Sequence, residues 1–337
     1  MKFVLSGIAA AAMALAGFAP GAMAQGSKLM LSSMSPGGSS NSKLFAEWGR
    51  ELAAASKGTL GFEMKDGVSL ASFTNVIDRV NADVLQIGWT MHAFYRGKFP
   101  LSEVGSLPFV ADDQMAGAEA TWRLYKTGML DAEYKELVPL WMVFVGFTKI
   151  HLAKPIASLD ELKGKKIRVA GHNQMLIGNL LDMSPQSIPA NDMYVALQRG
   201  TLDAIFTSWA AFVPYKLYEV STYHVEVPLG TSTTFFFMSR KKIASLPADA
   251  RRAIELHSGD RVNKRFAKHF YDQDLEGRQM TEKHGGHQIV PLPPATAAEW
   301  QKRIGDAVVA EWVKTTPGGD KVIEAYRKIY AGVKAGS

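Results

Sequence analysis

An arginine near the end of a short predicted strand is well suited to bind an anion. In the segment LKGKKIRVAG (162–171), the four residues Lys-Ile-Arg-Val predict a buried strand that carries Arg168. Arg168 stands near the carboxyl end of this strand, where α/β proteins bind their ligands. A guanidinium group matches a carboxylate with a planar fork of donors and stays charged. Arg168 could therefore bind an acid, or form a salt bridge with an Asp or Glu of its own chain.

Two tryptophans and a histidine lie close to other strand ends. Trp89 ends a predicted strand over 82–89, and Trp209 lies just beyond a strand over 202–207. Large aromatic residues are mostly buried for packing, and we expect this of most aromatic residues here. The positions of these two tryptophans favour ligand contact. His92 could donate to a ligand or lie exposed in a loop, and we prefer the loop.

No motif of the sequence indicates catalysis or a bound cofactor. The chain has no GxGxxG, GxxxxGK[ST] or GxSxG segment, and no local pattern organises its Ser, His and Asp residues. His284 and His287 in the segment HGGH could suggest a metal, but the two glycines favour a surface turn and no HExxH or cysteine accompanies them. We therefore expect no metal ion, no cofactor and no enzyme activity.

Alternating strands and helices position these residues. The first predicted series is strand 28–34, helix 43–55, strand 59–64, helix 72–80 and strand 82–89. The strand of Arg168 and the strand over 202–207 belong to a second such series, with helical segments between them. This alternation is typical of α/β domains with parallel strands. The β-forming segment LVPLWMVFVGF (137–147) could carry the chain from the first domain into the second.

The C-terminal part of the chain is predicted to be largely helical. Nearly all residues over 247–284 favour helix, and Val262, Phe266 and Phe270 recur every four residues. A continuous helix of this length would extend roughly 50 Å and bridge more than one small domain. Gly259 could instead bend it or divide it into two helices. A further amphipathic helix is expected over 295–313.

The N-terminus has the features of a Sec-type signal peptide. Lys2 precedes an apolar run, and Ala22-Met23-Ala24 provides a cleavage signal. The run is shorter than the roughly 20 residues that span a bilayer, so we expect cleavage after Ala24 and export to the periplasm. The chain lacks cysteine and has a net charge of +6. Its basic residues are interleaved with acidic ones, which does not favour nucleic-acid binding.

Four segments, in this order, resemble the solute-binding proteins of tripartite ATP-independent periplasmic (TRAP) transporters, the DctP-like family. They are FPLSEVGSLPF (99–109), LKGKKIRVAG (162–171), IPANDMYVALQRGTLDAI (188–205) and FFFMSRKKIASLPADARRAI (235–254). The resemblance implies a two-domain α/β periplasmic binding protein fold with crossing strands and a long domain-bridging helix. Domain I would comprise 25–146 plus about 232–272, and domain II 147–231 plus about 273–337.

The resemblance also implies a binding site between the domains. Arg168 falls on the family's signature arginine, which pairs with the substrate carboxylate. Thr207 occupies the position of a family asparagine, and Phe206 replaces a glutamate. Many members have a second arginine where this chain has Thr148 or its neighbour Lys149. A second carboxylate clamp is therefore not expected.

Aromatic residues stand beside these substituted positions. Phe147 and Phe206 adjoin them, and Trp89 and Trp209 lie at strand ends. We expect all four to contact the ligand. This composition favours a monocarboxylate with an apolar or aromatic body, or a 2-oxo acid, over C4-dicarboxylates and sialic acid.

The function that the resemblance implies is transport. The protein would trap an organic acid in the interdomain cleft, act as a monomer, and deliver the acid to the small and large permease subunits. Two other functions fit an exported two-lobed protein: a binding protein of an ATP-driven importer, and a periplasmic enzyme acting on a carboxylic acid. A neighbouring ATPase gene would favour the first, and turnover of a bound acid the second.

Overall fold

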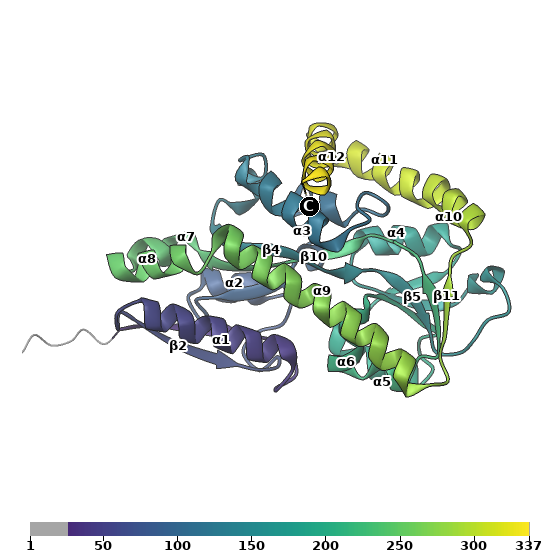
Figure 1. The fold of residues 1–337 in the computed structure, drawn as a ribbon, viewed down its shortest axis with the longest axis horizontal. Coiled ribbons are helices and arrows are strands. Elements are labelled where there is room, and N and C mark those ends of the chain that lie inside the picture. Colours follow the sequence, from purple (N-terminus) through teal and green to yellow (C-terminus); the bar gives the residue numbers. More distant parts are fainter. Residues whose placement is uncertain (1–25, 337) are drawn as a thin grey trace, which may run out of the picture.

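The computed structural model, which describes residues 26–336, has three groups of hydrogen-bonded strands with helices packed around them (Figure 1). We treat the two smaller groups as one sheet, because an isolated bridge joins them. This mixed α/β architecture agrees with the predicted fold class. The predicted signal peptide and its cleavage position after Ala24 lie outside the described residues. Within 26–336, no helix combines the length and the apolar character needed to cross a membrane.

The first sheet combines strands from distant parts of the chain. Its strands are β1 (Ser27–Ser32), β2 (Leu60–Lys65), β3 (Gly88–Met91), β4 (Leu137–Phe147) and β10 (Thr231–Ser239). β1 and β2 are parallel, whereas β3 and β4 flank β10 antiparallel. One parallel bridge, Leu31 to Ile87, joins the two groups. The strand expected over 82–89 is observed at Gly88–Met91 instead, so Trp89 lies near its start and not at its end. It is mainly antiparallel, because a distant segment, β10, pairs with it.

Helices cover this sheet. They are α1 (Ser40–Ala55), α2 (Val76–Asn81), α3 (Gln114–Lys126), α7 (Arg240–Ser245) and α8 (Ala248–Leu256). In α1 the hydroxyl of Ser39 accepts from the Ser42 amide and satisfies a donor that the first turn leaves free. Phe45, Trp48 and Leu52 of α1 are buried against the sheet at helical spacing. α1 therefore forms where its apolar stripe predicts a helix.

The second sheet carries the strand of Arg168. Its strand order is β11 (Gln288–Pro291), β9 (Tyr223–Glu226), β5 (Lys149–Leu152), β8 (Ala204–Thr207), β6 (Lys166–Val169), β7 (Ser184–Ser187). β6 is parallel to both β7 and β8. Arg168 and Thr207 consequently lie at neighbouring strand ends on one edge of the sheet. The helices of this part are α4 (His172–Leu180), α5 (Met193–Gln198) and α6 (Phe212–Tyr215).

Two adjacent connections join the sheets. β4 continues into β5 with Thr148 alone between them, and the chain returns from β9 to β10 beside this passage. The Thr148 amide donates to the Gly230 carbonyl (2.8 Å), and the Leu229 amide donates to the Thr148 carbonyl (3.1 Å). The expected crossing strands are therefore present, and they hold each other through backbone hydrogen bonds.

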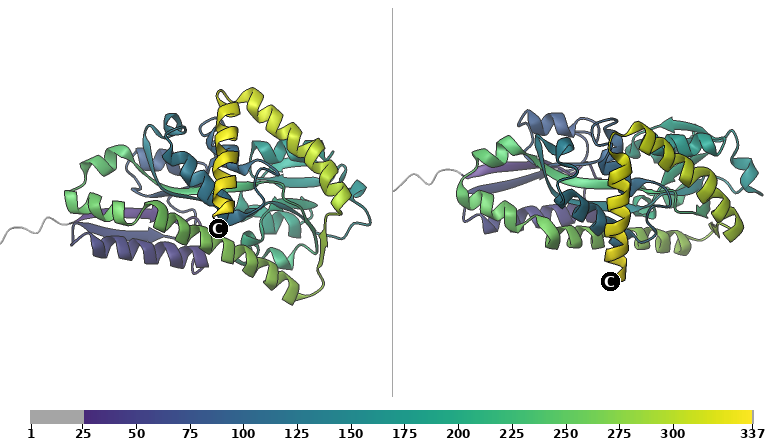
Figure 2. Two further views of the ribbon diagram at one scale, coloured as in Figure 1. Left: turned by 45° about the horizontal axis from the view of Figure 1, so that its top comes forward. Right: turned by 90° about the horizontal axis from the view of Figure 1, so that it is seen from above.

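A long helix crosses both sheets. α9 (Gly259–His284) packs on β4 and on the 3₁₀ turn Trp209–Ala211 beyond β8, and Figures 1 and 2 show it spanning the molecule. α8 and α9 are separate, so the helical region is divided near Gly259, which has a φ of +80°. The Asp274 carboxylate accepts from the Ala210 amide (2.9 Å), and Gln273 donates to Ser40 (3.0 Å). α9 thereby contacts elements of both sheets.

The C-terminal helices pack back over the molecule. α10 (Pro294–Trp300) continues through a π-helical turn (Gln301–Gly305) into α11 (Asp306–Thr315), so the helix expected over 295–313 is present, with a π-helical turn inside it. α12 (Gly319–Ala335), which was not predicted, packs against α3. Trp312 in α11 donates to the carbonyl of Pro100 (2.9 Å). These helices therefore contact the side of the first sheet after leaving the second.

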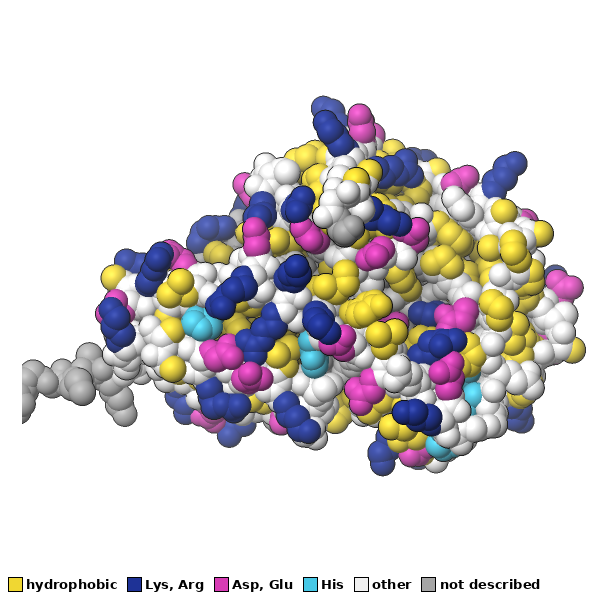
Figure 3. Space-filling view, in the orientation of Figure 1, with side chains coloured by type: hydrophobic (Ala, Val, Ile, Leu, Met, Phe, Trp, Pro, Cys, Tyr) yellow, Lys and Arg dark blue, Asp and Glu magenta, His cyan; other side chains and the backbone are white. Residues whose placement is uncertain are grey.

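Charged side chains of both signs are mixed on the face that α9 crosses (Figure 3). Arg265 of α9 pairs with Glu51 of α1 (2.6 Å), and Lys268 pairs with Asp272 one turn further along α9 (2.6 Å). Exposed ion pairs of this kind stabilise a protein only slightly. The contacts of α9 with the two sheets therefore depend mainly on its buried face.

Four histidines form a chain of contacts at one edge of the second sheet. The distances are 2.9 Å between His151 Nδ1 and His224 Nδ1, 3.1 Å between His224 Nε2 and His287 Nδ1, and 3.3 Å between His287 Nε2 and His284 Nδ1. Gly285 and Gly286 have positive φ and form the turn that ends α9, as predicted for HGGH. No group of His, Cys, Asp or Glu side chains in 26–336 is arranged to hold a metal ion.

We predict that Gly277→Ala destabilises the protein, because an added Cβ would lie 1.9 Å from the carbonyl oxygen of Trp209. Pushing α9 away from this turn should lower the free energy of unfolding by about 1–3 kcal/mol. Gly332→Ala is a matched control inside α12, where an added Cβ meets nothing within 4 Å. It should raise stability by about 0.5–1 kcal/mol. Thermal unfolding midpoints of the two variants should move in opposite directions, and a common direction would contradict this packing.

We also predict that acid destabilises the protein through its buried histidines. Burial lowers the pKa of His224 to about 3 from an ordinary value of 6.5, and burial lowers the pKa of His151 as well. Below about pH 6.5 these histidines therefore bind protons in the unfolded chain but stay neutral in the folded protein. The free energy of unfolding consequently falls as the pH decreases. One such histidine should cost on the order of 2 kcal/mol between pH 7 and pH 5.

The variant His224→Asn tests this prediction. Its unfolding midpoint, measured in urea at pH 7 and pH 5, should fall less than that of the natural chain over the same interval. His172→Asn, which removes an exposed histidine, is the control and should keep the natural pH dependence. An equal acid sensitivity in His224→Asn and the natural chain would refute the assignment.

Candidate functional site

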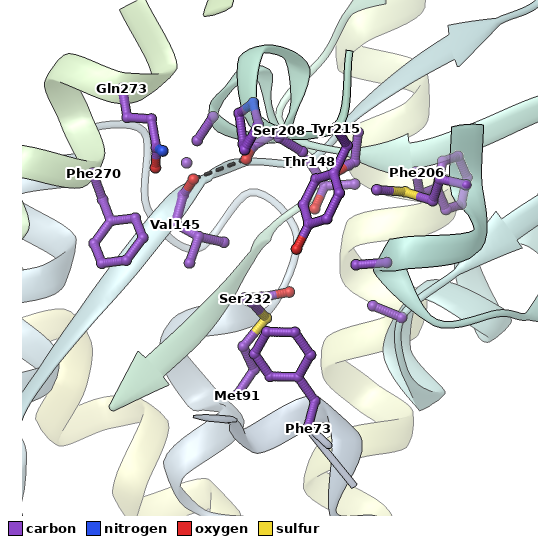
Figure 4. A pocket seen from close by; sticks show the side chains of 18 of the residues that line it. Phe73, Met91, Val145, Thr148, Phe206, Ser208, Tyr215, Ser232, Phe270 and Gln273 are labelled. Carbon is purple, nitrogen blue, oxygen red and sulfur yellow. Dashed lines mark hydrogen bonds between the residues drawn. The ribbon is translucent and has the colours of Figure 1, made fainter. Parts of the chain in front are cut away.

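A cavity lies between the two sheets, with about 670 Å³ of space not filled by atoms, counting its open mouth (Figure 4). Elements of both sheets and α9 line it. Its polar lining residues are Asn41, Thr148, Arg168, Gln174, Thr207, Ser208, Ser232 and Gln273. Its aromatic lining residues are Phe73, Trp89, Phe94, Phe206, Tyr215 and Phe270. Among the described residues that line the cavity, Arg168 alone carries a full charge.

Arg168 is held in place by backbone carbonyl groups. Its Nε donates to the carbonyl of Ile188 (2.8 Å), and its Nη1 donates to the carbonyl of Phe206 (3.2 Å). The side chain is only 3 % exposed. No residue of 26–336 forms a salt bridge with it or accepts a hydrogen bond from its Nη2. The structure therefore does not contain the salt bridge that the sequence left open, and part of the guanidinium fork remains available at the cavity.

The electrostatics of Arg168 follow from its burial. Burial lowers the pKa of Arg168 to about 10, because removing a cation from water disfavours the charged form. The guanidinium nevertheless stays protonated at neutral pH. A buried charge without an opposite charge beside it costs desolvation free energy. An anion that enters the cavity would offset this cost.

Two threonines and a glutamine lie near Arg168 at strand ends. Gln174, at the start of α4, accepts from the Ala170 amide (2.7 Å) and donates to the hydroxyl of Thr148 (3.1 Å). This leaves the Thr148 hydroxyl proton free to donate. Thr207 ends β8 beside Arg168, and its hydroxyl has no hydrogen-bond partner among the described residues. Both predicted threonines therefore line the cavity with Arg168.

Aromatic side chains form much of the remaining wall. The indole of Trp89 donates to the hydroxyl of Thr234 (2.7 Å), and its ring packs edge-on against Phe45 and Phe73 with centroids 4.9 and 5.2 Å away. Phe206 is fully buried next to Arg168. The predicted residues Trp89 and Phe206 thus lie at the cavity. Their dense packing makes this wall rigid.

Two predicted site residues belong to the core instead. Trp209 packs against His151 and Phe212 on the far side of its turn, and its indole donates to Glu226 (2.8 Å). His92 was expected in an exposed loop, but it is fully buried, because the 3₁₀ turn after β3 directs it inward against Phe99 and Phe235. Neither lines the cavity.

Phe147 also lies off the cavity, and a β-bulge explains this. Between Phe144 and Phe147, β4 has one residue more than the paired part of β10, and Gly146 within this stretch has a φ of +109°. An extra residue shifts the alternation of side chains between the two faces of a strand. Val145 and Gly146 therefore line the cavity, and Phe147 does not.

Lys149, the neighbour of Thr148, is directed elsewhere. Its ammonium lies 3.8 Å from the Asp274 carboxylate and 3.9 Å from the Glu226 carboxylate, and it does not line the cavity. Of the two residues at the position of the second family arginine, only Thr148 therefore faces the site.

The sequence did not predict several lining residues. Tyr215 reaches the cavity from α6, Ser232 from the crossing strand β10, and Phe270 and Gln273 from α9 (Figure 4). Tyr215 lies six residues beyond Trp209, so a search past the predicted strand end could have found it. No local signal marks Ser232 or the two residues of α9, because only the tertiary structure brings these segments to the site.

Comparisons with known proteins agree with this arrangement. A family model described as "Bacterial extracellular solute-binding protein, family 7" (DctP) matches residues 31–315. A solute-binding protein of Albidiferax ferrireducens is 24% identical over 295 residues, which cover 83% of this chain and 85% of that protein.

Solved structures of similar fold include two TRAP solute-binding proteins. One, from a marine metagenome, is specific for aromatic acid ligands and contains metahydroxyphenylacetate; it is 24% identical with a TM-score of 0.84, covering 91% of this chain and 99% of that chain. The other, from Rhodoferax ferrireducens, contains copurified benzoate; it is 24% identical with a TM-score of 0.84, covering 91% and 98% of the two chains.

The fold of TRAP solute-binding proteins, including the long helix across two α/β parts, is thereby established for this chain. Because the family model spans most of the sequence, the protein belongs to the DctP family of bacterial extracellular solute-binding proteins.

Proposed function

We propose that this protein captures an aromatic or otherwise apolar monocarboxylate in the cavity and delivers it to the membrane permease subunits of a TRAP transporter. One observation carries the proposal: Arg168 is the only charged residue among the described residues of the cavity lining, and it has no carboxylate partner in 26–336. A ligand with one carboxylate supplies the missing counter-charge. The aromatic and apolar lining then covers the rest of the ligand.

The polar groups around Arg168 fit a single carboxylate. Nη2 of Arg168 and the hydroxyls of Thr148 and Thr207 are the donors near the two strand ends. Charge-assisted hydrogen bonds to an arginine fork are stronger than neutral ones and orient the acid. A second carboxylate would find no second cation, because Lys149 is directed toward Asp274 and Glu226. This argues against C4-dicarboxylates.

Closure of the two parts of the molecule over the ligand explains tight capture. Arg168 and the threonines belong to the second sheet and its entry, whereas Phe73 and Trp89 belong to the first. Bringing the aromatic wall over a bound acid excludes water, which strengthens the ion pair and buries apolar surface. Contacts made only in the closed form shift the equilibrium toward it.

The ligands of similar proteins support this proposal. The two TRAP structures described above contain benzoate and metahydroxyphenylacetate, both aromatic monocarboxylates. The family also supports an extracytoplasmic location, and the N-terminal sequence supports export to the periplasm.

Binding without chemical change is part of the proposal. The cavity lining, as far as it consists of described residues, holds no Asp, Glu, His, Cys or Lys. General acid–base catalysis needs a titratable group within hydrogen-bond reach of the substrate. Tyr215 lines the cavity, but burial raises its pKa to about 12, which makes it a poor base at neutral pH. An acid recovered unchanged after denaturing the loaded protein would agree with this view, whereas conversion of the acid would refute it.

We predict that Arg168→Ala weakens benzoate binding by at least a hundredfold, because the carboxylate loses its only ionic partner in the cavity. Arg168→Lys should bind with intermediate affinity, since a lysine lacks the planar fork. Isothermal titration calorimetry measures both effects. Lys166→Ala, at the exposed start of the same strand, is the control and should bind as the natural chain does. Unchanged affinity in Arg168→Ala would refute the assignment of Arg168.

We further predict a selective response to a panel of acids. Benzoate, phenylacetate and 2-oxo monocarboxylates should raise the thermal unfolding midpoint, because each combines one carboxylate with a body that fits an uncharged lining. Succinate, malate and glucuronate should raise it little or not at all. A response only to dicarboxylates or uronates would overturn the proposed ligand class.

A further inference from the structure

Two hydroxyl groups face each other across the cavity, one from each side. Figure 4 shows the Tyr215 side chain extending from α6 with its hydroxyl directed toward Ser232 of β10. Tyr215 follows the second sheet, whereas Ser232 lies beside Met91 and Phe73 on the side of the first. Neither hydroxyl has a hydrogen-bond partner among residues 26–336.

The absence of a partner for Ser232 contrasts with its neighbours. Ser232 lies in the run Thr231-Ser232-Thr233-Thr234 of β10. The hydroxyl of Thr231 donates to the Gly146 carbonyl (2.7 Å), that of Thr233 contacts Ser106 (3.0 Å), and that of Thr234 donates to the Thr90 carbonyl (2.9 Å). Within this run, the one hydroxyl that the described protein groups leave unsatisfied is the one that lines the cavity. Ser232 is itself buried.

Tyr215 shows the same contrast. The hydroxyl of Tyr134, a fully buried tyrosine, contacts His92 (2.7 Å) and Ser102 (2.9 Å). The hydroxyl of Tyr326 donates to the carbonyl of Gly117 (3.3 Å). Burial raises the pKa of Tyr215 to about 12, while the charge of Arg168 opposes the shift. Tyr215 is therefore a neutral donor and acceptor that lies near Arg168.

A hydroxyl that no protein group satisfies needs a partner from the cavity, either water or ligand, because each lost hydrogen bond costs free energy. Two of them on opposite sides of one cavity indicate that the occupant supplies the partner. A hydroxyl group can accept from one and donate to the other, so it matches this pair better than an apolar group. A 2-oxo acid matches the pair less well. Its oxo group is attached next to the carboxylate carbon and would stay near Arg168, too far from Ser232, which lies beside Met91 and Phe73.

We propose that Tyr215 and Ser232 bind a hydroxyl group on the body of the ligand, which makes a hydroxylated aromatic monocarboxylate the class of acid that this protein selects. This inference rests on the proposed function, since it takes the carboxylate to be bound by Arg168. Arg168 then sets the affinity for acids in general. The two hydroxyls set the preference among them.

The expected preference for hydroxylated acids over benzoate follows from the hydrogen bonds that Tyr215 and Ser232 would lose with benzoate. An analogue that lacks its hydroxyl group forms neither hydrogen bond and leaves both protein hydroxyls without a partner from the ligand. A suitably hydroxylated acid should therefore bind about tenfold to a hundredfold more tightly than benzoate.

Calorimetry with five acids tests the inference: benzoate, 3-hydroxybenzoate, 4-hydroxybenzoate, mandelate and the 2-oxo acid phenylglyoxylate. In the natural chain, at least one hydroxylated acid should bind tenfold or more tightly than benzoate. In Tyr215→Phe and in Ser232→Ala this preference, measured as the ratio of the hydroxylated acid's affinity to that of benzoate in the same variant, should shrink at least threefold. Tyr194→Phe, which removes an exposed hydroxyl that donates to Glu219 (2.8 Å), is the matched control and should keep the preference.

Other outcomes separate this inference from the proposed function. If benzoate binds as tightly as every hydroxylated acid, or if both variants keep the preference, the inference is wrong and the proposed function stands. The inference is also wrong if Tyr215→Phe weakens the binding of all five acids equally, because the tyrosine would then bind the carboxylate. It is wrong as well if phenylglyoxylate binds most tightly of the five. If no acid binds the natural chain, the proposed function fails and the inference fails with it.

Discussion

A buried positive charge without a carboxylate partner among the described residues is the constraint on which the rest of the site depends. Two backbone carbonyls orient Arg168, and neither neutralises it. Removing an ion from water costs several kcal/mol unless an opposite charge replaces the lost hydration. The chain builds this charge into an otherwise uncharged lining, so the free protein is poised to accept an anion. The proposed selectivity for one carboxylate rests on this constraint, because a second carboxylate would bring the same cost without a second cation among the described lining residues.

The position of that charge depends on how the two sheets are joined. β4 and β10 cross between them side by side, and the bulge at Gly146 turns the crossing so that Val145 faces the cavity. α9 contacts both sheets, and the close approach of Gly277 to Trp209 holds its second half against the turn after β8. The crossing strands and α9 thus determine which side chains the two parts of the molecule present to each other.

The walls of the cavity differ in what they contribute. The aromatic side is rigid, since the indole of Trp89 is hydrogen-bonded to Thr234 and packed between Phe45 and Phe73. The polar side carries hydroxyls that the described protein groups leave unsatisfied, including those of Tyr215 and Ser232. A rigid apolar wall accepts many ligands of similar shape. Unsatisfied hydroxyls, in contrast, discriminate between ligands that carry a hydroxyl group and ligands that lack one. In the proposal made here, capture and selection are therefore assigned to different residues.

The α/β alternation, the strand of Arg168 and the long C-terminal helical region could be predicted from the amino-acid sequence, because hydrophobic periodicity and strand-end position are local properties. The break at Gly259 was left open, and α12 was missed. Thr148 and Thr207 were found through family segments that lie beside strand ends. Trp209 was placed wrongly, because whether a residue after a strand faces a cavity or a core depends on its turn. Only the tertiary structure brought Tyr215 and Ser232 together, since no local pattern records contacts between a helix of one sheet and a crossing strand of the other.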